Sequence, residues 1–301
     1  MTTASRLRRP VVLAAVFAVT AVVIPDPGVR HSDAALVRVQ TARAVDHRDD
    51  VVWILALGSD ARPGQAVTSQ RADAIQLVGL NLRTGAGTMV GIPRDSYVEI
   101  KGRGRDKINA AMQYGGPQLM ADSVGRLVGV RPDYVFTTGF LGFRAMVRAI
   151  GGVTVDSRFA FSDPIRPQGY RKGPNRLNPF QALIFSRIRK PLPNGDFSRS
   201  GNQQDLLRGI QRTVRARQSE PGFMERGVLA VVRDMETDLS PVELYRLAQS
   251  VSVIDPRKLR GCVLRGSTGY AGAASVVFPN VAQAKRIGRD ARKDGTLDRG
   301  C

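Results

Sequence analysis

Arginine, lysine and aspartate recur in short charged motifs along this sequence. Four motifs lie in its first half, at residues 58–62 (GSDAR), 71–73 (RAD), 93–96 (PRDS) and 107–109 (KIN), and two more follow at 186–189 (SRIR) and 195–204 (GDFSRSGNQQ). A guanidinium binds two phosphate oxygens at once. Carboxylates beside it can share a Mg²⁺ ion with the same phosphate group. The motifs therefore predict a site for a metal-bound pyrophosphate.

Two aspartates are the candidate ligands for a divalent cation. Asp60 and Asp73 bracket the loop between two apolar runs, and each has an arginine two residues away, Arg62 and Arg71 respectively. We expect Mg²⁺ or another divalent cation, because Mg²⁺ takes one or two protein carboxylates and completes its shell with phosphate oxygens and water. Taken alone, each aspartate is also explained as a turn or capping residue.

Histidine chemistry is excluded from the predicted domain. The only histidines, His31 and His47, precede the first strand-like segment at Val51. A Ser-His-Asp triad, a Cys-His pair and a histidine zinc site would each need a histidine inside the folded part. No P-loop, GxSxG or CxxC pattern is present either. The chemistry must come from carboxylates, cations, hydroxyls and backbone groups.

The net charge predicts an anionic partner. It is +19 over 301 residues, and arginine supplies most of the excess. Lipid head groups, phosphorylated substrates, acidic wall polymers and nucleic acid all fit such a charge. We expect no nucleic acid, because the chain opens with an export signal, acidic residues accompany the basic motifs, and no aromatic-rich binding strand is present.

The N-terminus has the pattern of an export signal. Arg6, Arg8 and Arg9 precede the apolar run 11–24. No clear cleavage site follows, which favours a signal anchor over a cleaved signal peptide. We therefore expect a cell-membrane protein with a single N-terminal anchor and an extracytoplasmic domain, or a secreted protein if the leader is cleaved.

The chain is divided into three parts. We predict a signal anchor or signal peptide at 1–25, a polar juxtamembrane linker at 26–50 and a single domain at 51–301. The two cysteines, Cys262 and Cys301, lie in the C-terminal part of that domain. An even number of cysteines in an exported protein predicts a disulfide between them.

Apolar runs and helical spacing alternate along the predicted domain. Near-continuous apolar runs predict buried strands, and capping signals predict helix starts. The predicted strands are 51–58, 74–82, 89–93, 97–100, 134–138 and 153–155, and the predicted helices are 108–114, 117–128, 141–150, a segment opening at 178–179, 199–219, 244–251 and 280–293. This alternation predicts a layered α/β/α sandwich around a central mixed β-sheet. The charged motifs fall at strand ends, where such sheets bind ligands.

In order and spacing, the motifs resemble the LytR-CpsA-Psr family. The shared pattern comprises GSDAR, RADAI, IPRDSYV, KINAA with YGGP, Phe-x-Gly-Phe at 140–143, AIGGV, and SRIRK with GDFSR and QQ. Members transfer glycopolymers such as wall teichoic acid, capsule or arabinogalactan from a polyprenyl-pyrophosphate carrier to peptidoglycan. The resemblance implies a phosphotransferase whose partners are a polyprenyl-pyrophosphate-linked glycan, peptidoglycan and the cell membrane.

The resemblance also implies roles for individual residues. Asp60 and Asp73 would hold the metal. Lys107 would orient or neutralise the head group, and Asp95 would support Arg94 or accept a proton. The side chains that would grip the pyrophosphate are Arg62, Arg71, Arg94, Arg187, Arg189 and Arg199, with Gln203 on the same surface.

Three positions depart from the family pattern. Asn202 stands where a second arginine is usual, Gly91 replaces a common serine, and residues 179–180 (PF) stand where a glycine is typical. We expect Asn202→Arg to be tolerated and to strengthen anion binding by about 1 kcal/mol. The family also implies an apolar pocket for the prenyl chain, which we place against the helices at 119–128 and 143–150.

The expected reaction is phosphoryl transfer. A sugar hydroxyl, by resemblance a muramic acid hydroxyl of peptidoglycan, would attack the phosphorus nearest the glycan and expel the lipid monophosphate. Two alternatives stay open. One is a non-catalytic protein that binds wall polymer or lipid pyrophosphate, and the other is a lipid-pyrophosphate hydrolase that uses water as the acceptor.

Overall fold

A computed structural model describes residues 32–40, 50–226, 235–298 and 301. The predicted leader at 1–25 and both histidines lie outside these residues. In the described part of the chain, no helix is both long enough and apolar enough to cross a membrane. Residues 32–301 form one compact unit, which contains the sheet, its covering helices and the charged motifs.

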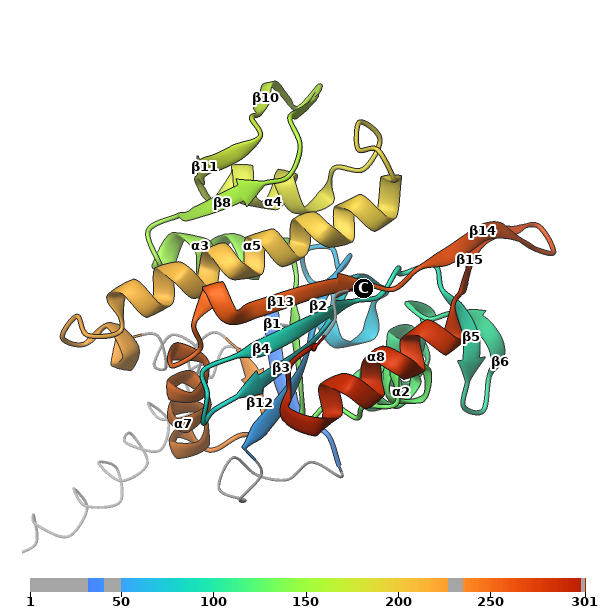
Figure 1. Cartoon of the computed structure of the whole chain (residues 1–301), viewed down its shortest axis with the longest axis horizontal. Helices are drawn as coiled ribbons and strands as arrows, with labels where there is room; N and C mark the ends of the chain where they lie inside the picture. Colours follow the sequence, from blue (N-terminus) through green and yellow to red (C-terminus); the bar gives the residue numbers. More distant parts are fainter. Residues whose placement is uncertain (1–31, 41–49, 227–234, 299–300) are drawn as a thin grey trace, which may run out of the picture. The chain divides into compact units, whose positions relative to one another are not determined.

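Seven strands form a central mixed sheet in the order β12-β1-β7-β2-β3-β4-β13 (Figure 1). The strands are β1 (Ala34–Arg38), β2 (Val51–Ser59), β3 (Ala72–Asn81), β4 (Gly87–Gly91), β7 (Tyr134–Thr138), β12 (Glu236–Thr237) and β13 (Leu259–Val263). The pairs β12–β1, β7–β2 and β4–β13 are parallel, and the other pairs are antiparallel. The prediction of a central mixed sheet is therefore confirmed.

Helices cover both faces of this sheet (Figure 1). On one face, α2 (Ala110–Val128) and α8 (Val281–Asp294) pack in the same core cluster as the fully buried Leu55 and Leu77. On the other face lie α5 (Gly195–Arg217) and α7 (Pro241–Ser252), whose Leu244 and Leu247 pack with Val52. Burial on both faces explains why the strand sequences are near-continuous apolar runs. The layered α/β/α architecture is confirmed.

A second group of elements packs on the α5 side of the sheet. It contains α3 (Phe140–Ala149), α4 (Pro179–Arg187), the antiparallel pair β8 (Val153–Ser157) with β11 (Gly173–Leu177), and the hairpin β9 (Phe161–Asp163) with β10 (Arg166–Tyr170), which lies between them in the sequence. Its core joins Val155, Phe161, Tyr170 and Phe185 to Leu206 of α5. Only β8, α3 and α4 were predicted, because the other strands are short and rich in glycine, proline and charge.

Two further hairpins extend from the ends of the sheet strands. They are β5 (Tyr97–Ile100) with β6 (Gly104–Lys107), and β14 (Gly266–Ala271) with β15 (Ala274–Pro279). The sequence patterns predicted β5 alone. The two hairpins contact each other, and an isolated bridge joins Ser96 to Val277.

Local sequence signals predicted two helix starts correctly. Asn178 and Ser240 each form a capping box with the residue three positions on, Gln181 and Glu243. The break predicted between two helices at 108–114 and 117–128 is a kink within α2, at Gly115 and Gly116. Gly116 has a φ of 61°, which favours glycine.

The predicted linker at 26–50 was wrong for residues 34–38. These residues form β1, which pairs with β7 on one side and β12 on the other. Their segment, AALVR, is too short to show a strand period, and its burial depends on strands far along the chain. The folded domain therefore begins before residue 51.

The structure pairs Cys262 with Cys301, whose Cα atoms lie 5.3 Å apart. Cys262 is buried on the edge strand β13, and Cys301 follows α8. The bond therefore ties the end of the chain to the sheet beside the helix that covers it.

We expect Cys301→Ala to lower the thermal midpoint of the oxidised protein by about 5–10 °C, since closing a loop of this length contributes up to about 4 kcal/mol in the chain-entropy model. Cys301 is exposed, so the substitution opens no cavity in the core. Thermal unfolding with and without a reducing agent checks this. The reductant should bring the native protein down to the variant's midpoint and leave the variant unchanged. Two free thiols in the oxidised, denatured native protein would contradict the pairing.

Candidate functional site

The ends of β2, β3 and β4 bring the charged motifs to one edge of the sheet. β2 ends at Ser59 and β3 begins at Ala72, and these residues are register partners because the strands are antiparallel. The backbone N–H of Asp60 donates to the carbonyl oxygen of Arg71 at 3.1 Å, which closes the loop between the two strands. β4 ends at the same edge, just before Arg94. Strand ends thus assemble the site, as the sequence predicted.

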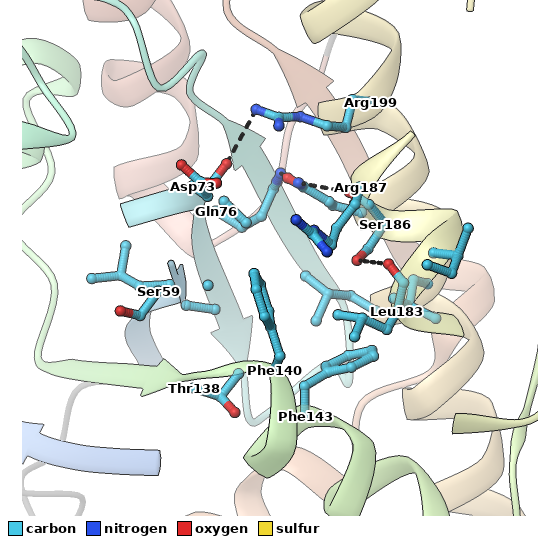
Figure 2. Close-up of a pocket in the computed structure, with 18 of the residues that line it drawn as sticks. Ser59, Asp73, Gln76, Thr138, Phe140, Phe143, Leu183, Ser186, Arg187 and Arg199 are labelled. Carbon is cyan, nitrogen blue, oxygen red and sulfur yellow. Dashed lines mark hydrogen bonds between the residues drawn. The ribbon is translucent and has the colours of Figure 1, made fainter. Parts of the chain in front are cut away.

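Asp73 contacts two arginines, Arg94 and Arg199, and Figure 2 shows its contact with Arg199. Arg94 Nη1 donates to Asp73 Oδ1 over 2.5 Å. Arg199 Nη2 donates to the carbonyl oxygen of Asp73 at 3.2 Å and pairs with Asp196 at 2.6 Å. Burial lowers the pKa of Arg199, Asp196 opposes that shift, and the neighbouring charge of Arg94 adds to it. An anion placed between the two guanidinium groups would relieve their repulsion.

Asp60 is the second carboxylate at this edge. Partial burial raises its pKa, and the negative charge of Asp73 raises it further. The positive charges of Arg71 and Arg94 act in the opposite direction. Two carboxylates that interact in this way would be stabilised by a shared cation.

Asp95 and Lys107 form an ion pair beside this cluster. Lys107 Nζ lies 3.0 Å from Asp95 Oδ1, and Arg94 Nε lies 3.8 Å from Asp95 Oδ2. Asp95 therefore links Lys107, at the end of β6, to Arg94, which pairs with Asp73. Of the two roles left open for Asp95, these contacts favour support of Arg94.

The remaining predicted arginines occupy two places. Arg187 and Arg189 line a cavity that opens beside Asp73, and the guanidinium of Arg187 lies 4.3 Å from the centroid of the Phe140 ring. Arg71 and Arg62 are exposed and lie outside the cavity wall. Arg71 still acts on Asp60 electrostatically, whereas the backbone of Arg62 is held by a loop hydrogen bond to Gln65.

A buried polar network supports the site and was not predicted, apart from Gln203. Gln76 Nε2 donates to Ser200 Oγ at 2.9 Å and to Gln203 Oε1 at 3.2 Å. Gln203 in turn donates to the carbonyl oxygen of Ser186 at 3.2 Å. The network joins β3, α4 and α5, and so fixes the helices that carry the arginines. Its signal was Gln76, a polar side chain within the apolar run of a buried strand.

The cavity at this cluster has a volume of about 420 Å³ (Figure 2). Asp73, Arg94 and Arg199 form its charged end. The rest of its wall is mostly apolar and includes Phe136, Phe140, Phe143, Met146, Leu183 and Ile184. The cavity therefore combines an anion-binding end with a hydrophobic interior.

A second cavity, of about 640 Å³, adjoins the first between the sheet and helices α5 and α7. Its wall is almost entirely apolar, and the residues common to both cavities are Ala56, Phe136, Met146, Leu207 and Ile210. Ile54 and Val78, on neighbouring strands, line its floor. The hydrophobic space thus continues from the charged cluster into the middle of the domain.

Of the two helices that we predicted to line the prenyl pocket, one does so. The segment 143–150, which comprises most of α3 and its C-cap residue, supplies Phe143, Met146 and Ile150 to the cavity walls. Residues 119–128 pack instead into the core on the opposite face of the sheet, and assigning them to the pocket was wrong. Both segments are apolar helices, and the sequence does not specify which face of the sheet each helix covers.

Asn202 lies outside the cavity wall. The residue is 0% exposed, and neither its amide nitrogen nor its side-chain carbonyl oxygen has a hydrogen-bond partner. The expectation that an arginine here would reach a phosphate rested on an exposed position, so we revise it.

We now expect Asn202→Arg to lower the free energy of unfolding by about 2 kcal/mol or more, because a guanidinium at this position would be buried without a partner. Asn202→Leu keeps the number and branching of the side-chain heavy atoms and removes two unpaired polar atoms, so it should be neutral or stabilising. Urea unfolding of both variants provides the comparison. Equal stability of the arginine variant and the native protein would show that this part of α5 can open to admit a charge.

Asp60 and Asp73 fit a divalent cation whose remaining coordination positions would be filled by a bound phosphate and water. In the described part of the chain, no group of three or more His, Cys, Asp or Glu side chains is arranged to hold a metal. Asp60 and Asp73 supply two carboxylates, and Mg²⁺ sites in phosphoryl-transfer proteins often use one or two together with phosphate oxygens and water. The effect of Asp73 on the pKa of Asp60 supports the same pairing.

The fold and the cavity together define a class of protein. It is an α/β protein with a cationic cluster at the end of a long hydrophobic cavity, which suits an amphiphile with an anionic head group. The LytR_cpsA_psr family model matches residues 27–293. This chain belongs to the LytR-CpsA-Psr family.

Similar proteins agree with that membership. The chain is 39% identical over 162 residues to the polyisoprenyl-teichoic acid–peptidoglycan teichoic acid transferase TagU of Bacillus licheniformis, covering 54% of this chain and 51% of that protein. Identity to TagU of Bacillus subtilis is 38% over 165 residues, with 54% and 52% covered. The chain thus spans about half the length of these curated relatives.

Solved structures share the fold. The crystal structure of B. subtilis TagU superposes with a TM-score of 0.63 at 26% identity, covering 83% of this chain and 99% of that one. The structure of the LytR-CPS2A-psr family protein YwtF (TagT) with bound octaprenyl pyrophosphate lipid superposes with a TM-score of 0.62 at 22% identity, covering 84% and 95%.

Proposed function

We propose that this chain is a phosphotransferase that moves a glycopolymer from a polyprenyl-pyrophosphate carrier to peptidoglycan. One observation carries the proposal: the Asp73–Arg94–Arg199 cluster lies at the end of a hydrophobic cavity that continues past Ala56 into the domain. A polyprenyl pyrophosphate has a matching shape, with a charged head and a long apolar tail. The names of the relatives, and the octaprenyl pyrophosphate bound to a protein of the same fold, support this ligand class.

The residues at the charged end supply positioning and charge neutralisation. Arg94 and Arg199 would hold the two phosphates, and Arg187 and Arg189, at and just after the end of α4, would also contact the head group. The acceptor hydroxyl would form a new O–P bond at the phosphorus nearest the glycan. The bridging P–O bond would break, and the lipid would leave as a monophosphate. Fixed guanidinium groups stabilise the charge that moves to the leaving phosphate, which is the main demand of phosphoryl transfer.

The pair Asp95 and Lys107 would act at the side of the attacking hydroxyl. Lys107 neutralises the carboxylate of Asp95, and Asp95 aligns Arg94. Asp95 is also the carboxylate to which we assign the hydroxyl proton, because Asp60 and Asp73 are committed to the cation. Asp95 would then have two roles, the alignment of Arg94 and the acceptance of the hydroxyl proton.

We further propose that Asp60 and Asp73 bind Mg²⁺ or another divalent cation, which would neutralise the pyrophosphate and polarise its oxygens. Protons compete for these carboxylates. Since the pKa of Asp60 is raised, cation affinity should increase with pH over a range above the usual titration of aspartate. We also propose that the chain is anchored in the cell membrane by its N-terminal segment, with the domain outside the cytoplasm.

The test is incubation of the full chain with a lipid-pyrophosphate saccharide and soluble peptidoglycan fragments, followed by mass spectrometry. We expect a joined product in which the saccharide phosphate is esterified to a peptidoglycan sugar. Free saccharide phosphate alone would identify a hydrolase. Unchanged substrates, despite tight binding of the lipid, would identify a non-catalytic binding protein.

A further inference from the structure

Two hairpins beside the charged cluster present an exposed aromatic surface. Tyr97 of β5 and Phe278 of β15 meet edge to face, with ring centroids 6.0 Å apart. The guanidinium of Arg105, on β6, lies 4.9 Å from the centroid of the Tyr97 ring. Phe278 is 38% exposed. We call Tyr97, Arg105 and Phe278 the aromatic shelf.

The shelf continues directly from the proposed reaction centre. Tyr97 and Lys107 are register partners across the β5–β6 hairpin, so their side chains lie on the same face. Lys107 pairs with Asp95 at 3.0 Å. From the other hairpin, the N–H of Val277 donates to the carbonyl oxygen of Asp95 at 2.9 Å. Both halves of the shelf are therefore bonded to the Arg94-Asp95 turn.

Side-chain alternation separates this face from the buried one. Val98 and Ile100 of β5 are buried, whereas Tyr97 and Glu99 point outward. In the other hairpin, the Phe278 ring lies over Gly269, where an added Cβ would come within 2.9 Å of the ring. Tyr270 is 74% exposed but belongs to the opposite face of the same hairpin. The shelf is thus a one-sided surface.

The chemistry of the shelf suits a glycan whose substituents carry carboxylates. A partly exposed aromatic ring offers a flat apolar face to the C–H groups of a pyranose, which water would otherwise cover. The guanidinium of Arg105 offers a fork for a carboxylate. In the proposed reaction the donor fills the cavity, so the acceptor must approach from outside it, beside Asp95.

We propose that the aromatic shelf is the acceptor site, which binds the glycan strand of peptidoglycan and directs one of its hydroxyls toward the phosphorus held by Arg94. The proposal rests on the proposed transfer reaction. A sugar stacked on Phe278 and Tyr97 would place its neighbour in the strand next to the Asp95–Lys107 pair. Peptide carboxylates of the strand would reach Arg105.

The test compares Phe278→Ser with Tyr270→Ser in the full chain held in detergent micelles. Direct binding of a soluble peptidoglycan tetrasaccharide-peptide, measured by calorimetry without any donor, should weaken about 3- to 10-fold in the Phe278 variant. The KM for the same acceptor in the transfer assay should rise by the same factor. The Tyr270 variant should match the native protein in both measurements, because its ring lies on the opposite face.

Arg105→Gln provides a second variant in case Phe278→Ser loses stability, which thermal unfolding would reveal. It should weaken binding of the peptide-bearing fragment more than binding of the same tetrasaccharide without peptides. Native affinity and KM in both shelf variants, or equal losses in the Tyr270 variant, would overturn the acceptor site and leave the transfer reaction intact. Weakened fragment binding in a protein that transfers nothing would retain the site and overturn the transferase function.

Discussion

Replacing Asp73 by asparagine should reduce the proposed glycopolymer transfer by about 100-fold or more and weaken the Mg²⁺ dependence that we propose for it. Asparagine keeps the shape of the side chain but removes its charge. The substitution therefore takes one of two carboxylates from the proposed cation and removes the negative charge that lies 2.5 Å from Arg94. Arg94 and Arg199 would then be oriented less well for the pyrophosphate.

The measurement is a Mg²⁺ titration of transfer rate for the variant and the native protein side by side. Asp50→Asn is the matched control, because Asp50 also forms a salt bridge to an arginine, Arg83 at 3.0 Å, but on the exposed surface. That control should retain the native rate and metal response. Near-native turnover of the Asp73 variant with an unchanged metal response would refute the metal assignment. A loss of thermal stability that accounts for the lost activity would instead make Asp73 structural.

Filling the passage between the two cavities should weaken binding of long-chain carriers by about 10-fold or more, because the apolar tail would lose the space beyond the passage. Ala56 lines both cavities from β2, and Ala56→Phe places a ring at their junction. A carrier with a prenyl chain short enough to stay in the first cavity should bind with nearly native affinity. The dependence of affinity on chain length is therefore the informative quantity.

The prediction is checked by calorimetric binding of carriers of increasing prenyl length. Met146→Trp narrows the same passage from α3, and it replaces Ala56→Phe in the experiment if that substitution destabilises the sheet. Ala145→Phe introduces the same ring at an exposed position of the same helix and should leave binding unchanged. If long and short carriers lose affinity equally in the Ala56 variant, the tail does not pass through the junction.

The Asp73 and Ala56 variants act on opposite ends of the site. The Asp73 variant should keep its affinity for the apolar tail while transfer fails, and the Ala56 variant should keep its metal response while binding of long carriers fails. If both variants lost both transfer and the binding of long carriers, the substitutions would have damaged the fold. The structure therefore lets chemistry and lipid binding be tested independently.

The sequence by itself determined the elements whose signals are local. The apolar runs of β2 and β3 predicted buried strands because burial on both faces requires apolar residues throughout. The capping boxes at Asn178 and Ser240 fixed two helix starts, because a cap involves only residues within one turn. The charged motifs were found at strand ends, and the absence of histidine after His47 limited the chemistry to cations and carboxylates.

The tertiary structure decided what depends on distant residues. The motifs did not show that Arg94 pairs with Asp73 while Lys107 pairs with Asp95, since either carboxylate is a chemically suitable partner. The strand at 34–38 gains its stability from β7 and β12, and neither is close to it in the sequence.

The cavity was also decided by tertiary packing. The apolar helices at 119–128 and 143–150 look alike in pattern, yet one fills the core and the other lines the cavity. A helical pattern identifies an apolar face, but the partner of that face is set by how the layers close around the sheet. The partners of buried polar groups such as Gln76 are also set by tertiary packing, because the helix that supplies them lies next to β3 only in the folded chain.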